Sequence, residues 1–88
     1  IDLDTFLTIP AEDVKPYLKE RNFQPANLES LSNILLEAGK RTALEDPVKA
    51  RLYYSRVLDL YSLMDQVYGS ISLDRYQKES WLQSQLKQ

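Results

Sequence analysis

A regular series of apolar side chains between residues 46 and 68 constrains the fold of this chain more than any other sequence feature. The series advances by four and three residues alternately, through Ala50, Tyr54, Val57, Tyr61, Met64 and Tyr68. Side chains at these intervals lie on one face of an α-helix. A second series runs beside the first, through Tyr53, Leu60 and Val67. So wide an apolar face predicts a helix that neighbouring elements cover on more than one side.

The predicted helix has a well-defined start, where Asp46 is followed by Pro47. An aspartate side chain can cap the free backbone N–H groups of a helix start. Proline suits the first helical position because its missing N–H would have no partner there. Gly69 and Ser70 are expected to end the helix. The sequence therefore predicts a helix over residues 46–68.

Residues 25–39 are predicted to form a second amphipathic helix. Its apolar stripe consists of Leu28, Leu31, Ile34, Leu35 and Ala38. Pro25 suits the first helical position, and Gly39 is expected to end the helix in the left-handed conformation that glycine adopts without strain. Residues 40–45 form a short connector. We therefore expect the two helices to pack as an antiparallel hairpin.

Shorter helical segments are expected on both sides of this hairpin. Residues 1–9 are expected to be a short helix or an irregular segment that covers part of the core. Within residues 10–22 a helix is predicted to start near Ala11, with an irregularity at Pro16; a start at Val14, which would put Pro16 in the first turn, is the alternative. Ser72 is expected to cap a last helix, whose apolar residues are Leu73, Tyr76, Trp81, Leu82 and Leu86. The predicted fold class is all-α, a small bundle of about four helices.

The composition excludes several kinds of functional site. The chain has no cysteine and no histidine, which removes the commonest metal ligands, the thiol nucleophile and the commonest general base. The carboxylates, lysines and tyrosines that remain show no catalytic spacing. We therefore assign no catalytic, metal-binding or cofactor-binding residue, and we expect neither enzymatic activity nor a small-molecule substrate.

Charge and hydropathy narrow the classes of partner. The net charge is −2, with basic residues interleaved among acidic ones, whereas nucleic-acid binding needs a basic stripe. A weak nucleic-acid contact at the basic pair Lys40 and Arg41 stays an alternative interpretation. No apolar run approaches the ~20 residues that span a membrane. Because no targeting signal is visible either, we expect a cytoplasmic protein.

Tyrosine is the most unusual part of the composition, with six tyrosines in 88 residues. Large aromatic side chains with a polar tip are common at protein interfaces, but at helical spacing they also build cores. The residues of a candidate partner surface are Tyr53, Tyr54, Arg56, Tyr61 and Trp81. The sequence alone leaves open whether these residues form a binding surface or part of a buried core.

The excess of aromatic face favours a protein-interaction module that binds a protein partner or a second copy of itself. A purely structural or regulatory domain of a longer protein is the other interpretation, because the chain begins at Ile1 rather than at a methionine. In both cases residues 1–88 are expected to form a single helical domain.

Two resemblances add to this interpretation. The run Ala-Arg-Leu-Tyr-Tyr-Ser-Arg-Val-Leu-Asp-Leu-Tyr from Ala50 to Tyr61 is similar to the second helix of a tetratricopeptide repeat. Residues 14–23 and 28–39 resemble small bacterial helical proteins of unknown function, in which a helical hairpin ends in a segment similar to residues 69–75. The first resemblance implies a tetratricopeptide-like hairpin, and the second a bacterial origin. Neither implies an activity or a site residue.

Overall fold

The computed structural model describes residues 2–68 and 73–87, and within them every regular element is helical. The elements are α1 (Leu3–Thr8), the 3-10 turn η1 (Ala11–Asp13), α2 (Val14–Glu20), α3 (Pro25–Thr42), α4 (Pro47–Tyr68) and α5 (Leu73–Leu86). The prediction of an all-α fold is confirmed. The short helix α1 brings the α-helices of the described residues to five.

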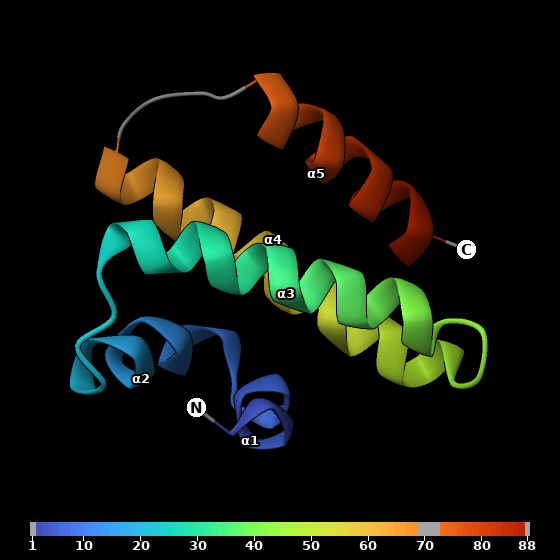
Figure 1. Ribbon diagram of the computed structural model, residues 1–88, viewed down its shortest axis with the longest axis horizontal. Coiled ribbons are helices and arrows are strands. Elements are labelled where there is room, and N and C mark those ends of the chain that lie inside the picture. Colours follow the sequence, from blue (N-terminus) through green and yellow to red (C-terminus); the bar gives the residue numbers. More distant parts are fainter. Residues whose placement is uncertain (1, 69–72, 88) are drawn as a thin grey trace.

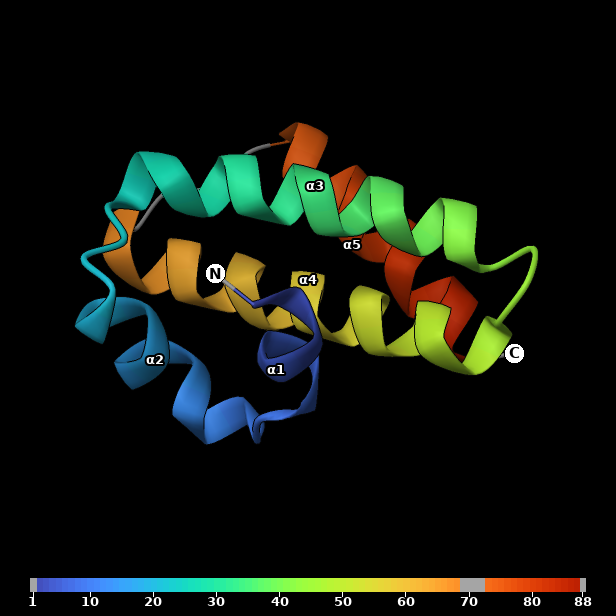
Figure 2. The ribbon, with the colours of Figure 1, turned by 60° about the horizontal axis from the view of Figure 1, so that its bottom comes forward.

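Helix α4 is the central element of the fold. α3 lies antiparallel along it, α5 packs on a second side, and α1 and α2 lie on the side away from α5 (Figures 1 and 2). The core residues of α4 are Ala50, Tyr53, Tyr54, Val57, Leu60, Tyr61, Leu63 and Met64. The wide apolar face predicted for this helix is therefore covered on more than one side, as expected.

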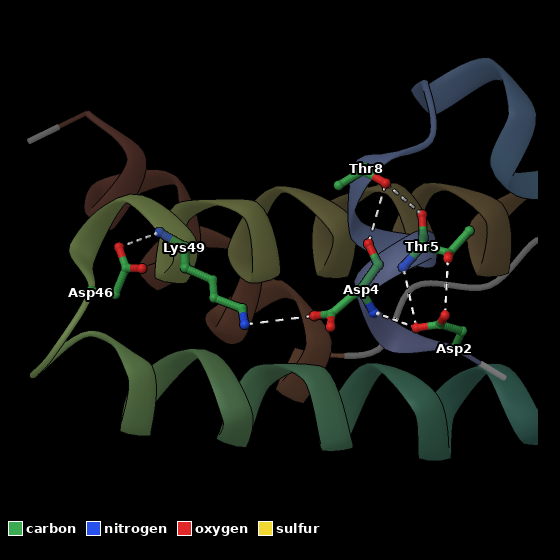
Figure 3. Close-up of polar contacts among 6 residues, drawn as sticks. All are labelled: Asp2, Asp4, Thr5, Thr8, Asp46 and Lys49. Atoms are coloured by element: carbon green, nitrogen blue, oxygen red, sulfur yellow. Dashed lines mark hydrogen bonds and ion pairs between the residues drawn. The ribbon is translucent and has the colours of Figure 1, made fainter.

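Helix α4 begins as predicted. The carboxylate of Asp46 accepts a hydrogen bond of 3.1 Å from the backbone N–H of Lys49 (Figure 3). Pro47 is the first helical residue. The predicted end at Gly69 and Ser70 and the predicted cap at Ser72 lie outside the described residues. The side chain of Tyr68, placed in the first apolar series, lies outside them too.

Helix α3 is longer than predicted, because it continues through Gly39 to Thr42. The prediction that Gly39 ends the helix is wrong. Gly39 lies inside the helix, where α3 and α4 approach most closely: a β-carbon at this position would lie 2.8 Å from Cε1 of Tyr54 and 3.0 Å from Cβ of Tyr53. The lack of a side chain at Gly39 permits this close approach, and the backbone of the residue is helical.

Two short helices cover the core at the N-terminal end of the chain. In α1, the carboxylate of Asp2 accepts the backbone N–H groups of Asp4 and Thr5 at 3.1 and 3.4 Å (Figure 3). This capping lets so short a helix form. Its residues Phe6 and Leu7 are buried in the common core.

The helix predicted near Ala11 starts there as a 3-10 turn and becomes α-helical at Val14. Pro16 therefore falls in the first turn of α2, where its missing N–H costs no helical hydrogen bond. Asn22 ends the segment in the left-handed region, with φ 57°. The N–H of Phe23 then donates to the carbonyl of Leu18 at 3.1 Å. This bond is part of the usual C-terminal stop of a helix.

Candidate functional site

The structure separates the five residues of the candidate partner surface. Tyr53, Tyr54, Arg56 and Tyr61 are only 3 to 8% exposed, whereas Trp81 is 39% exposed. Four of the five therefore belong to the interior of the chain, as in the buried-core alternative that the sequence left open. Only Trp81 is placed where a partner can reach it.

The tyrosines are buried because each neighbour of α4 covers part of its aromatic face. Gly39 lets α3 lie directly against Tyr53 and Tyr54. Trp81 of α5 packs edge-on against the Tyr54 ring, with 5.4 Å between ring centroids. Burial raises the pKa of the Tyr54 and Tyr61 hydroxyls above the usual value for tyrosine. Both side chains belong to the packed core.

Arg56 has a structural role that the sequence interpretation missed. Its guanidinium donates to the carbonyl oxygens of Leu7 and Ile9, at the C-terminal end of α1, and pairs with Asp59 at 3.1 Å. It also lies over the ring of Phe6, 5.4 Å from the ring centroid. Arg56 therefore holds α1 against α4 instead of lining a binding surface.

Burial shifts the pKa values of both Arg56 and Asp59. It lowers the pKa of the Arg56 guanidinium, while the nearby Asp59 carboxylate opposes that shift. Burial also raises the pKa of Asp59, again opposed by its partner. A signal for this role exists in the sequence, because Arg56 falls between Tyr53 and Leu60 at steps of three and four. Its position therefore belongs to the second apolar series of the helix.

Trp81 opens onto a groove between α3 and α5. The groove has a volume of about 440 Å³ and is lined by Asn33, Leu36, Glu37, Lys40, Asp74, Gln77, Lys78 and Trp81. It exists because α3 and α5 both pack mainly on α4, with little contact between their own backbones in the described residues. Leu36 is buried, so it and the Trp81 ring give the groove an apolar base.

Paired charges form the rim of this groove. The ammonium of Lys40 lies 5.2 Å from the centroid of the Trp81 ring and 3.9 Å from the carboxylate of Glu37. Across the groove, Lys78 pairs with Asp74 at 3.2 Å and lies 3.5 Å from the side-chain oxygen of Asn33. With two charges of each sign already paired, the groove has no strong preference for an anion or a cation.

No family model, no curated protein and no solved structure matches the chain. The resemblances to tetratricopeptide repeats and to small bacterial helical proteins therefore stay predictions.

Two further findings concern metal sites and membrane-spanning helices. Within residues 2–68 and 73–87, no group of three or more acidic side chains is placed to hold a metal ion. No helix in the same part of the chain is both long and apolar enough to cross a membrane.

Proposed function

We propose that this chain is a non-enzymatic protein-interaction module, and that the groove between α3 and α5 receives an amphipathic helix of a partner protein. The observation that carries this proposal is the exposed Trp81 ring at the base of a groove with a mixed-charge rim. Tryptophan is among the residues that contribute most to protein interfaces, and partly exposed apolar grooves commonly accept helices.

The arrangement of the helices supports a helical partner. α3 and α5 run in roughly the same direction, and α4 runs opposite to both (Figure 1). A partner helix lying between α3 and α5 would therefore complete a four-helix arrangement, antiparallel to its two new neighbours. Such packing places apolar residues of the partner on Leu36 and Trp81 and its polar residues along the charged rim.

The antiparallel pair of α3 and α4 also supports the tetratricopeptide-like interpretation as part of this proposal. Hairpins of that family bury their faces against neighbouring repeats. In this chain α5 packs on α4 where a neighbouring repeat would pack in that family, and the groove beside α5 is open to a partner.

Selection from a displayed library of helical peptides tests this function. Peptides selected on the native chain should bind at least about 10-fold more weakly to Trp81→Ser, because a central tryptophan contributes strongly to an interface. Gln77→Arg, which places a bulky charge on the groove wall, should weaken the same peptides without removing any core contact. Tyr76→Ser is the matched control, because Tyr76 is an exposed aromatic residue of α5 that does not line the groove.

Two outcomes would contradict the proposal. One is a set of selected peptides that bind both groove variants as well as they bind the native chain. The other is a dimeric mass in light scattering that becomes monomeric in Gln77→Arg, which would make a second copy the occupant of the groove.

A further inference from the structure

A second apolar surface lies at the beginning of α4. Its aliphatic residues Val48 and Leu52 are 74 and 43% exposed, and Leu44, in the connector just before the helix, is 91% exposed. Val48 and Leu52 are one helical turn apart and share a groove of about 440 Å³ with Leu7 of α1. Exposed aliphatic residues gathered at one place mark an interaction site more often than single exposed residues do.

Carboxylates predominate around these aliphatic residues. Asp4 and Asp46 line the same groove, where Lys49 is the one basic residue among the described residues of the lining. The ammonium of Lys49 lies 3.6 Å from the Asp4 carboxylate, and Figure 3 shows the Asp46 carboxylate at the backbone N–H of the same lysine. The partial positive charge of the α4 N-terminus offsets about half of one carboxylate. The lining therefore keeps a negative character.

We propose that this surface binds a basic amphipathic segment of a partner protein. We call it the Val48 surface and define it by the exposed Val48 and Leu52, which lie beside the buried Leu7, with the lining charges Asp4, Asp46 and Lys49. Apolar residues of the segment would cover the aliphatic side chains, while its lysines or arginines would face the carboxylates. A second copy of this chain would bring like charges together, and an anionic membrane would be repelled.

The Val48 surface is separate from the groove at Trp81. α1 and α5 lie on opposite sides of α4 in both ribbon views (Figures 1 and 2). One chain can therefore hold two partners at once, which goes beyond a module with a single groove. The two sites also share no lining residue.

The test uses a synthetic helical peptide with leucines along one face and lysines elsewhere. In an NMR titration, we expect shifts at the methyl groups of Val48 and Leu52. Val48→Ser should weaken binding about 10-fold, because it removes most of one buried aliphatic side chain from the contact. It should leave the fold intact, since Val48 is exposed. A peptide of the same composition in scrambled order is the control for unspecific charge attraction.

Asp4→Asn and Lys49→Gln form a matched pair of charge variants. Both remove the same ion pair, but they change the charge of the surface in opposite directions. Asp4→Asn should weaken binding of the lysine peptide about two- to five-fold, and Lys49→Gln should strengthen it by a similar factor. A purely structural effect of the ion pair would move both affinities in the same direction.

Four results would overturn this inference. The first is that Asp4→Asn and Lys49→Gln change the affinity for the lysine peptide in the same direction. The second is that a peptide with glutamates in place of lysines binds equally well. Shifts could appear at the Trp81 indole and not at the Val48 surface. Dimerisation abolished by Val48→Ser would assign the surface to a second copy. None of these results depends on the groove variants Trp81→Ser and Gln77→Arg, so the two proposals fail separately.

Discussion

Gly39 of α3 lies against the ring of Tyr54 of α4 so closely that a β-carbon at position 39 would be only 2.8 Å from Cε1 of the ring. The same ring packs edge-on against Trp81 of α5. One contact between two residues thus sets how closely α3 approaches α4, and it supports the aromatic pair beside the candidate groove. Gly39 itself does not line the groove.

Gly39→Ala is expected to destabilise the fold. Alanine in place of glycine inside a helix normally stabilises by up to about 1 kcal/mol. Here the added methyl group overpacks the interface between α3 and α4, which costs about 1 to 3 kcal/mol. Tyr54 cannot simply turn away, because it is buried and packed against Trp81. We expect a net loss of about 1 kcal/mol in the free energy of unfolding, measured by urea denaturation.

Ser30→Ala is the matched control for helix propensity, because Ser30 is an exposed residue of the same helix. It should change stability by no more than about 0.5 kcal/mol. In a double-mutant cycle, replacing Tyr54 by leucine should reduce the cost of Gly39→Ala. A stabilised Gly39→Ala variant would show that the two helices can separate without loss.

The features of the fold that could be predicted from the sequence are those with local causes. Asp46 caps α4 through an N–H only three residues away, so residue types and spacing suffice to find the helix start. Gly39 could not be assigned in this way, because the same residue type serves as a helix end or as a close contact. Which role applies depends on Tyr54, which lies on another helix.

The candidate site likewise combines features with local causes and features that depend on packing between helices. Helical spacing predicts which side chains of α4 lie on one face, but it does not say whether a neighbour covers that face. Tyr53 and Tyr61 are buried because α3 and α5 flank α4, and this follows from tertiary packing. Trp81 remained partly exposed since α3 and α5 leave a groove between them.

Arg56→Ala is expected to detach α1 from α4. The change removes the donors to the carbonyl oxygens of Leu7 and Ile9 and leaves the partly buried Asp59 without its partner. We expect a loss of about 2 kcal/mol in unfolding free energy, below the full cost of breaking a buried ion pair because Asp59 still reaches solvent. Hydrogen exchange of the α1 amides, compared with those of α3, would show whether the loss is concentrated in α1.

Arg51→Ala is the control for Arg56, because Arg51 is an exposed arginine on the same helix. Its effect should stay within about 0.5 kcal/mol. If both variants lost the same small amount, the contacts of Arg56 to α1 would contribute nothing to stability.

Tyr61→Phe is expected to leave the fold equally stable or stabilise it by up to about 1 kcal/mol. The Tyr61 hydroxyl is buried and has no hydrogen-bond partner among the residues that the structure describes. Removing it abolishes an unfavourable burial of a polar group and keeps the ring. Thermal unfolding measures the difference, with exposed Tyr76→Phe as the control. A clear loss of stability would mean that the hydroxyl is hydrogen-bonded in solution.

The stability of α1 is expected to depend on pH through Asp2. Hydrogen bonds from the Thr5 hydroxyl and from backbone N–H groups lower the pKa of the Asp2 carboxyl. A carboxyl whose pKa is lower in the folded state stabilises that state above its unfolded pKa of about 3.9. This contribution is lost as the pH falls through the lower, folded value. Protection of the α1 amides from hydrogen exchange should therefore decrease below about pH 4.

Asp2→Asn separates this effect from the titration of other carboxyl groups. Asparagine caps a helix about as well as aspartate but does not ionise, so the variant should show no acid loss specific to α1. Asp59 cannot produce the same signal, because burial raises its pKa and its contribution to stability therefore grows as the pH falls. If α1 of Asp2→Asn lost protection over the same pH range as the native chain, another acid of the protein would be the cause.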